Sequence, residues 1–451
     1  KILFKKGFAM NKLLWGVIAI IGAACFGYLA LQQGETVSAM YLVVAAVCIY
    51  MIAYRFYGRF VAYKVLELDK NRATPAMIND DGRDFVPTNK SVLFGHHFAA
   101  IAGAGPLVGP ILAAQMGYLP SMLWILVGGV FAGAVHDFVV LFISSRRNGK
   151  SLGEIIKEEL GTFVGGVTMI AIFGIMLIII AILSMVVVKA LAESPWGLFT
   201  IAMTIPIAIF MGIYMRYLRP GKVGEASVIG FILLILAIHY GSIIAADPYW
   251  KQVFTFDATT LAFIMMAYGF IAAVLPVWFL LAPRDYLSTF LKIGVIVLMA
   301  IAIVIVAPDI QMPKMNTQYF DGSGPVFAGA IFPFLFITIA CGAISGFHAL
   351  ISSGTSPKML ENETHALPVG YGSMLMESAV AIMALICATI LHPGLYFAIN
   401  SPAVFIGTDV VQVAQTISTW GFSVTPEEIF TLTKNIGEET ILSRTGGAPT
   451  F

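Results

Sequence analysis

The chain has 451 residues, of which 59% are hydrophobic and only 11% are charged, and its mean hydropathy is +0.89. A soluble globular domain carries roughly 25% charged residues, so this composition excludes that class and predicts an all-α polytopic membrane protein. The formal net charge of +1, without a basic run that contains interleaved aromatics, argues against a nucleic-acid partner. The four cysteines lie in apolar stretches without CxxC spacing, so we expect neither disulfides nor zinc ligands.

In chain order, eleven apolar stretches are long enough to cross a bilayer as helices. They cover residues 13–31, 37–54, 93–115, 122–144, 162–189, 197–217, 225–245, 259–281, 287–307, 326–350 and 369–391. Residues 1–9, before Met10, are expected to be a leader and are set aside from the fold. With these spans, 21 of the 26 Lys and Arg residues fall on the side of the N-terminus and five on the other side. The positive-inside rule therefore predicts a cytoplasmic N-terminus.

The third and eighth stretches run in opposite directions and lie five spans apart, which predicts two inverted five-helix repeats. The expected domains are two peripheral helices with a cytoplasmic loop (10–92), the first repeat (93–258), an incomplete second repeat (259–391) and an extracytoplasmic segment (392–451). A Gly-Gly-Ala-Pro turn at 446–449 is typical of the entry to another helix. We therefore expect the last segment to lead to a twelfth helix that is missing from this chain.

Glycine and proline gather in the same two stretches, where they free backbone groups that hydrocarbon cannot satisfy. The third stretch contains Gly103, Gly105, Pro106, Gly109 and Pro110, and the eighth contains Gly269 and Pro276. Two broken helices in matching positions of two halves indicate a transporter binding site. The alternative is a close-packed kinked helix, because small residues are common where membrane helices touch. The candidate substrate-binding residues are Gly103, Ala104, Gly105, Pro106, Pro276 and Trp278.

Ionisable residues in the fourth and tenth stretches are candidates for ion coupling, because a charge inside a membrane is costly. Asp137 is expected to pair with a histidine or with a basic residue elsewhere in the chain. Such a pair would titrate near physiological pH and could couple proton movement to transport. The alternative is a hydrogen-bonded polar contact that only holds helices together. Hydroxyls near His348 suit a sodium ion or a proton relay, although helix capping also explains such a cluster. The candidate ion-coupling residues are His136, Asp137, His348, Ser352, Ser353 and Lys358.

Several other polar residues are candidates for roles near the ion path or at the membrane surface. Lys358 would mimic the charge of a bound cation if a proton has replaced sodium, and Glu377 is the remaining candidate for a buried acid. Arg284 and Asp285 are expected to form a gate or a topology anchor at the cytoplasmic exit. Two adjacent histidines at 96 and 97 cannot easily chelate one metal, because neighbours on a helix point about 100° apart. One of them is expected to face the core and the other the lipid headgroups.

Five sequence blocks resemble the carbon starvation protein A family, and the resemblance extends from about Tyr57 to the end of the chain. The blocks are GHHFAAIAGAGPLVGP (Gly95–Pro110), GGVFAGAVHDF (Gly128–Phe138), AVLPVWFLLAPRDYL (Ala273–Leu287), SGFHALISSGTSPK (Ser345–Lys358) and SRTGGAP (Ser443–Pro449). The resemblance implies a bacterial inner-membrane protein for uptake of peptides or pyruvate, with proton coupling in the pyruvate carriers. Through the amino-acid/polyamine/organocation superfamily it also implies a LeuT-like core, with Ser352 and Ser353 near the usual cation position.

The patterns and the resemblance together predict a secondary active transporter that imports peptides or a small carboxylate such as pyruvate, coupled to protons or sodium. No cofactor is expected, and the choice between peptide and pyruvate, the coupling ion and the oligomeric state are left open. One alternative is an intramembrane metal-dependent enzyme, but the chain contains no HExxH motif and no plausible nucleophile–base pair. The other is a nutrient sensor that binds a ligand without transporting it.

Overall fold

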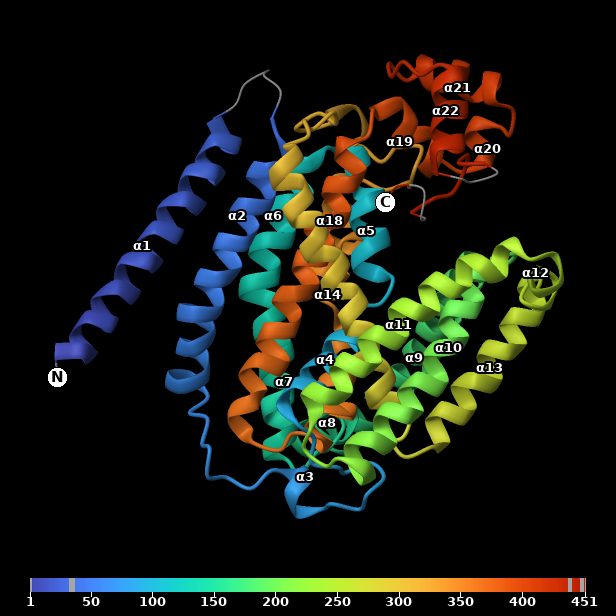
Figure 1. Cartoon of the computed structure of the whole chain (residues 1–451). Coiled ribbons are helices and arrows are strands. Elements are labelled where there is room, and N and C mark those ends of the chain that lie inside the picture. The colour runs from blue at the N-terminus through green and yellow to red at the C-terminus, as the bar shows by residue number, and fades with distance from the viewer. Residues whose placement is uncertain (1, 32–36, 437–439, 447–449, 451) are drawn as a thin grey trace.

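A computed structural model describes residues 2–31, 37–436, 440–446 and 450 of the chain. In this part of the chain the regular elements are helices, and β pairing is limited to two isolated bridges. The long helices are α1 (Ile2–Leu31), α2 (Ala39–Ile52), α4 (Lys90–Ile101), α6 (Tyr118–Gly128), α7 (Ala134–Arg146), α9 (Thr162–Leu191), α10 (Pro195–Ile213), α11 (Val223–Ala246), α13 (Ala258–Val274), α14 (Leu281–Val306) and α18 (Ser373–Ile390). Figure 1 shows them as a bundle with α18 near its centre.

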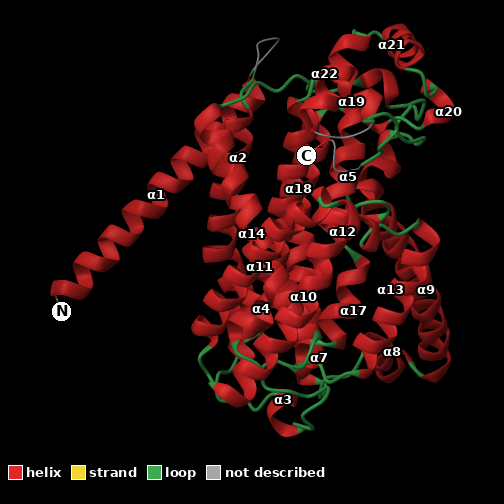
Figure 2. Ribbon diagram, turned by 45° about the vertical axis from the view of Figure 1, so that its right-hand side comes forward, coloured by secondary structure: helices red, strands yellow, loops and turns green. Residues whose placement is uncertain are grey.

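Shorter helices connect and cover this bundle. They are α3 (Pro75–Ile78), α5 (Gly105–Ala113), α8 (Leu152–Leu160), α12 (Pro248–Val253), α15 (Phe336–Thr338), α16 (Ala340–Ala343), α17 (Gly346–Gly354), α19 (Pro393–Asn400), α20 (Ala403–Ile406), α21 (Val410–Thr419) and α22 (Pro426–Ile436). Helix α3 lies at one end of the bundle, and α19 to α22 lie together at the other end (Figure 2). We call these the α3 end and the α19 end.

Among the described residues, seven helices are long and apolar enough to cross a membrane, and a bent pair raises the number to eight. The share of the apolar window that is buried ranges from 83% for Glu363–Ile390 to 0% for Thr162–Leu191. The helix that contains α18 therefore forms the centre of the bundle. The apolar window of α9 is exposed on the outside of the bundle, as expected of a helix that faces lipid. These findings define a multi-pass membrane protein.

Four of the eleven predicted spans do not correspond to one of these seven helices, and the stretch 93–115 is the bent pair. The stretches 13–31 and 259–281 contain shorter apolar helices, Leu13–Leu29 and Ala258–Val274. The stretch 326–350 is a succession of short helices, beginning with a π-helical turn at Ile331–Leu335. The described part of the predicted leader, from Ile2 onward, is helical and continuous with the rest of α1. The turn predicted at 446–449 falls largely on residues 447–449, which lie outside the described residues.

The break predicted in the third span is present. Helix α4 ends at Ile101, and Ala102 leaves the helical region with φ −80° and ψ 65°. Helix α5 then begins at Gly105 with Pro106 in its first turn, where a missing amide hydrogen costs nothing. The two helices form a bend of 44°. The interruption lies within one apolar span, as the glycine and proline pattern predicted.

The second predicted break is wrong. Helix α13 continues through Gly269 to Val274, and Leu275 adopts the extended conformation that a following proline favours. Pro276 therefore ends this helix instead of interrupting it. The second interrupted segment is the one that runs from the π-helical turn at Ile331–Leu335 to α17, where Ile344 is extended (φ −159°, ψ 111°) between α16 and α17.

The two interrupted segments run antiparallel and contact each other at both ends. At the α3 end, Thr88 forms an isolated parallel bridge with Leu360. At the α19 end, Gln115 Oε1 accepts a hydrogen bond from the amide of Val326 at 3.0 Å. Asn316 Nδ2 donates to the carbonyl of Gln115, also at 3.0 Å. The start of one segment thus lies beside the end of the other.

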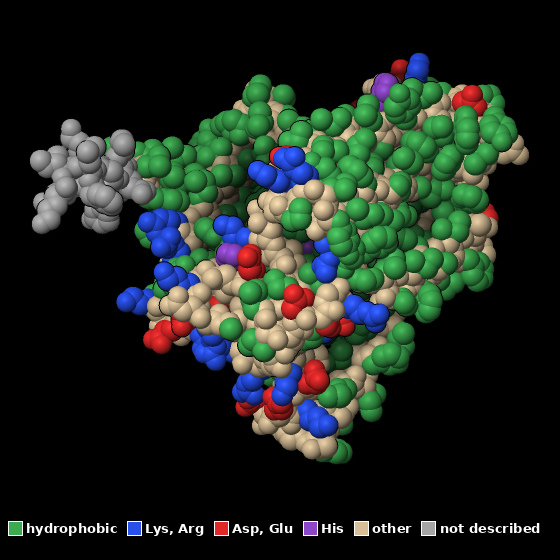
Figure 3. Space-filling view, turned by 60° about the horizontal axis from the view of Figure 1, so that its bottom comes forward, with side chains coloured by type: hydrophobic (Ala, Val, Ile, Leu, Met, Phe, Trp, Pro, Cys, Tyr) green, Lys and Arg blue, Asp and Glu red, His purple; other side chains and the backbone are tan. Residues whose placement is uncertain are grey.

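The distribution of charged side chains agrees with a membrane orientation. Figure 3 views the molecule with its α3 end brought forward, and Lys, Arg, Asp and Glu side chains gather on this face while hydrophobic side chains cover the flanks. One ion pair on this side joins Arg146, at the end of α7, to the buried Glu363. Glu363 Oε2 also accepts the amide of Asp69 at 2.7 Å. These contacts tie the loop after α2 to the end of the bundle.

Candidate functional site

Titratable side chains from three helices meet in the interior of the bundle. Asp137 on α7, His348 on α17 and Glu377 on α18 are all fully buried. His348 Nδ1 lies 2.8 Å from Asp137 Oδ2, and His348 Nε2 lies 3.0 Å from Glu377 Oε2. The partly exposed His136 places its Nδ1 2.8 Å from Asp137 Oδ1. We call these four residues the buried charge cluster.

Small residues allow the backbones to come close enough for this cluster to form. A methyl group added at Gly133 would collide with the carbonyl of Ala343, and one added at Gly342 would collide with Ala381 on α18. The break before α17 then places His348 in the first turn of a new helix, between α7 and α18. Membrane helices use such small residues for close approach.

The geometry makes the cluster a site where proton occupancy sets the local charge. A protonated His348 would face two carboxylates and partly balance them, whereas a neutral His348 would leave both without a counter-ion. Inside an apolar bundle an unbalanced charge is expensive, so the cluster favours states in which protons compensate the carboxylates. Such a group of buried, mutually facing acids and bases is typical of proton relays in membrane transporters.

One group of side chains is close enough to hold a metal ion among the described residues. Ligand atoms of Cys341, His348 and Glu377 lie within 4.8 Å of one another, and Cys341 Sγ is 3.3 Å from Glu377 Oε1. Both ring nitrogens of His348 already face carboxylates, which is the arrangement expected of an imidazolium between two anions. We therefore interpret this group as part of the proton site.

Two helix N-termini are located at the breaks, and neither has a side-chain cap. The N-cap residues are Ala104 for α5 and Ser345 for α17. The backbones of Gly103 and Gly346 are exposed, and no atom would lie within 4 Å of a methyl group added at either position. Uncapped N-termini present free amides and the positive end of the helix dipole, which suits a carboxylate.

The first of these N-termini adjoins the buried charge cluster. A methyl group on Gly105 would lie 2.5 Å from Cys341 Sγ, which in turn contacts Glu377. The predicted substrate-binding stretch 103–106 therefore lies next to Cys341, which leads through Glu377 to the predicted ion-coupling residue His348. A ligand bound at the break would be close to the groups that can exchange protons.

The predicted hydroxyl and lysine residues lie farther toward the α3 end. Ser353 Oγ donates to the carbonyl of Ala349 at 2.7 Å and accepts the amide of Leu152 at 3.1 Å. Lys358 Nζ lies 5.4 Å from the ring centre of Phe85. Ser352 is buried, one helical turn beyond His348. Ser353 and Lys358 thus contact the segments that close the α3 end.

The adjacent histidines on α4 are both buried, so the expectation that one would face the headgroups is wrong. His96 Nδ1 lies 2.8 Å from Asp285 Oδ2, which places Asp285 in a side-chain pair with α4. His97 Nδ1 lies 2.6 Å from Ser356 Oγ. The two rings point to different partners because neighbouring helical positions diverge by about 100°.

Sequence reasoning missed Lys292, which was counted with the cytoplasmic charges. Helix α14 begins at Leu281, earlier than the predicted span, so Lys292 lies near the middle of a membrane helix. Its Nζ donates to the carbonyls of Ala99 and Ala102, at 3.0 and 2.8 Å. The signal that could have found it is a lone lysine within an apolar run, since such residues are rare and usually functional.

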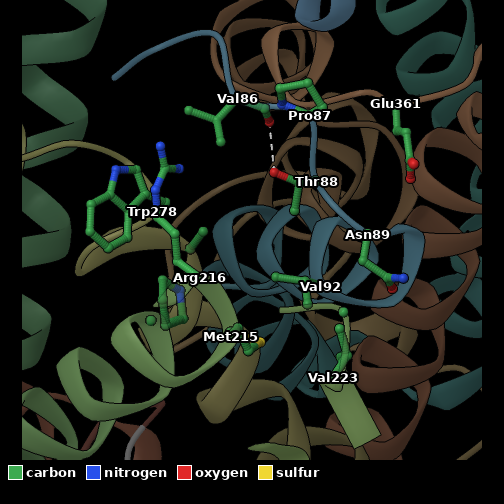
Figure 4. A pocket seen from close by; sticks show the side chains of 14 residues that line it. Val86, Pro87, Thr88, Asn89, Val92, Met215, Arg216, Val223, Trp278 and Glu361 are labelled. Carbon is green, nitrogen blue, oxygen red and sulfur yellow. Dashed lines mark hydrogen bonds between the residues drawn. The ribbon is translucent and has the colours of Figure 1, made fainter. Parts of the chain in front are cut away.

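Pro276 and Trp278 lie at the α3 end, away from the break in α4–α5. Trp278 lines a cavity of about 320 Å³ together with Asn89, Arg216 and Glu361, among others (Figure 4). The Arg216 guanidinium carbon lies 4.5 Å from the ring centre of Trp278. Trp278 Nε1 donates to the carbonyl of Gly82 at 3.1 Å. The loop before α14 therefore shapes an opening on the charged side.

The turn that holds Trp278 is expected to depend on pH. Amides of Arg83, Asp84 and Phe85 donate to Asp81 Oδ1 and hold the pKa of this carboxyl below its usual range, the Arg83 amide most strongly. A lowered pKa in the folded state means that the stabilisation is present above the ordinary pKa and is lost as pH falls through the folded value. Below about pH 4 the turn should loosen.

Fluorescence can check this expectation, because loosening would expose Trp278 to water. We expect an acid-induced emission change that is lost in Trp278→Phe and also absent in Asp81→Asn, which cannot titrate. An acid transition identical in the protein and in Asp81→Asn would contradict the assignment to this carboxyl.

The fold and the site define a multi-pass membrane protein with two antiparallel interrupted helices and buried titratable groups beside them. Residues 38–451 match the family described as Carbon starvation protein CstA, so the chain belongs to this family, as its sequence blocks indicated. It is 85% identical to the peptide transporter CstA of Campylobacter jejuni, over 98% of this chain and 63% of that protein. It is 58% identical to the pyruvate/proton symporter BtsT of Escherichia coli, over 97% of this chain and 64% of that protein.

A third relative, the peptide transporter CstA of Escherichia coli, is 60% identical over 98% of this chain and 64% of its own length. The chain thus spans less than two thirds of the curated relatives that it matches. No solved structure matches it.

Proposed function

We propose that this chain is the membrane core of a secondary active transporter that imports peptides or a small carboxylate such as pyruvate with protons. The observation that carries the proposal is the position of an uncapped helix N-terminus, at Gly105, beside the buried charge cluster. The free amides would bind the substrate carboxylate, and the cluster would bind the coupling proton. The names of the relatives, a peptide transporter and a pyruvate/proton symporter, support the proposed substrate class and the proposed proton coupling.

In this mechanism Gly103, Ala104, Gly105 and Pro106 form the substrate site. The carboxylate approaches the first turn of α5 from the side of Gly103, where no atom would lie within 4 Å of an added methyl group. Pro276 and Trp278 act at the α3-end cavity, through which substrate would leave toward the cytoplasm. A backbone-lined carboxylate site would serve peptides and pyruvate alike, so another part of the protein must distinguish substrates of different length.

The proton is carried by His136, Asp137, His348 and Glu377. Protonation of the cluster neutralises part of its negative charge, which favours the approach of a substrate carboxylate to the adjoining N-terminus. Release of the proton restores the charge and repels the substrate. Ser352, Ser353 and Lys358 would support this site from the α3 end, where the Ser353 hydroxyl joins α17 to the amide of Leu152.

The membrane arrangement that accompanies this proposal has about eleven spans in the bacterial inner membrane, with the N-terminus in the cytoplasm. It includes the LeuT-like inverted repeats at 93–258 and 259–391, with peripheral helices in 10–92 and an extracytoplasmic segment at 392–451. Support comes from the antiparallel direction of the two interrupted segments and from the charged α3 end. The second interruption at Ile344 instead of Pro276 requires a different pairing of helices within the repeats.

Proton movement in proteoliposomes tests the proposal. Addition of pyruvate, dipeptides or tripeptides, with and without sodium, should acidify the lumen for one substrate class without any need for sodium. Failure of every substrate to move protons, in protein shown to be folded, would overturn the transport proposal. Binding of a substrate without flux would favour a sensor. Stoichiometric zinc or iron at Cys341, His348 and Glu377 would favour the metal-dependent enzyme instead.

A further inference from the structure

Two carbonyls at the break in α4–α5 have lost their helical partners for separate reasons. The carbonyl of Ala102 would normally accept the amide of residue 106, but Pro106 has no amide hydrogen. The carbonyl of Ala99 would accept the amide of Gly103, but that amide bonds to the carbonyl of Ile101 instead, at 2.9 Å. Both oxygens therefore need a donor or a cation at membrane depth, where water is absent.

The ammonium of Lys292 satisfies both carbonyls at once. Its Nζ lies 3.0 Å from the oxygen of Ala99 and 2.8 Å from the oxygen of Ala102. The lysine enters from α14, which packs along α4, so the donor comes from a different helix than the acceptors. An ammonium has three donors, and the two carbonyl bonds use two of them.

A lysine near the middle of a membrane helix is costly, so its retention there requires a compensating role. The charged groups near it are Asp285, Glu377 and Arg284. Two of these three are acidic, and one of them, Glu377, belongs to the buried charge cluster. The positive charge of Lys292 thus lies near the backbone oxygens of the break and near two acids, Asp285 and Glu377.

We propose that Lys292 is a built-in cation: its ammonium occupies a carbonyl cradle that would otherwise bind an alkali ion, and it thereby excludes sodium from the break. Carbonyl oxygens are hard ligands that accept a small metal cation or an ammonium. Because Lys292 is covalently tethered, the cradle is filled without any ion from solution. The inference rests on the proposed transport function and adds that the transporter needs no sodium at this break.

From the sequence, Lys358 was the candidate for this role, but the contacts described above favour Lys292. Lys358 faces Phe85 at the α3 end, whereas Lys292 contacts the carbonyls that the break releases. If Lys292 has this role, the wild-type protein should not respond to sodium, whereas a variant without this lysine should.

The test uses Lys292→Ala, which removes the ammonium and leaves room in the cradle. Thermal unfolding of the purified protein in sodium or choline chloride reports cation binding without requiring transport. We expect no sodium-specific stabilisation of the wild-type protein and a clear one in Lys292→Ala. In proteoliposomes, substrate uptake by this variant should fall about tenfold in choline and partly recover in sodium. Lys189→Ala, at an exposed lysine near the end of α9, is the control and should behave as wild type.

A second variant, Lys292→Met, keeps the proposal testable if the alanine variant does not fold. Methionine fills the same space without a donor, so uptake should be lost in every salt and sodium should not restore it. Full uptake by Lys292→Met, or sodium-specific stabilisation of the wild-type protein, would overturn the inference. If the wild-type protein transports nothing, the transport proposal fails, while the unfolding experiment still decides whether Lys292 replaces a cation.

Discussion

Replacing Asp137 with asparagine is expected to abolish substrate-driven proton uptake, with a loss of at least about a hundredfold. The carboxylate of Asp137 faces His348 on one oxygen and His136 on the other, so its charge is the centre of the buried cluster. Asparagine keeps the size of the side chain but cannot take up the coupling proton. It also leaves Glu377 as the remaining carboxylate of the cluster beside His348.

Two assays separate coupling from substrate binding in this variant. Acidification of the proteoliposome lumen measures proton uptake, and counterflow exchange of labelled substrate measures binding and reorientation without net proton movement. Asp137→Asn should lose the first and retain part of the second. The control is Asp247→Asn, where the side chain caps α12 and asparagine caps equally well. Proton uptake at the wild-type rate in Asp137→Asn would remove this residue from the coupling mechanism.

Replacing Gly109 with alanine is expected to destabilise the fold by on the order of 1–3 kcal/mol, because the added methyl group has no space. Gly109 lies on α5 directly against the carbonyl of Thr338, in the other interrupted segment. Both sides of this contact are backbone, so neither can turn away as a flexible side chain could. The two segments would have to separate, and the adjoining N-terminus of α5 would move with them.

Thermal unfolding in detergent measures this effect, and Gly174→Ala is the matched control. Gly174 lies on α9, where no atom would come within 4 Å of an added methyl group. Its replacement should leave the melting temperature unchanged or slightly raised, since alanine is the better helix former. An unaltered melting temperature in Gly109→Ala would show that the two segments are less closely packed than the structure indicates.

The sequence alone predicted the features that depend on local chemistry. Composition predicted the membrane class, and Gly103, Gly105 and Pro106 predicted the break in α4–α5 because each acts on its own backbone. Asp137 was expected to pair with a histidine or another basic residue, since a buried acid needs a partner, and it lies beside His136 and His348. The long sequence blocks correctly indicated the family.

Features that depend on the length of neighbouring helices could not be predicted in the same way. Pro276 looked like a kink, but α13 ends one residue before Leu275, so the proline has no helix left to break. The real interruption at Ile344 lacks a proline and follows from tertiary contacts of the small residues around it. Lys292 was misplaced because α14 begins six residues earlier than the hydropathy pattern suggested. Its acceptors are backbone oxygens, which no side-chain pattern reveals.

The attachment of the two interrupted segments at both ends has a mechanical consequence. Near one end Thr88 is joined to Leu360, and near the other Gln115 is joined to Val326 and Asn316. Because both ends are held, neither segment can tilt without the other. Flexing at the breaks, at Ala102 and Ile344, is the movement that remains. Such flexing would change the spacing of the two segments at mid-depth, beside the buried charge cluster, while their ends stay together.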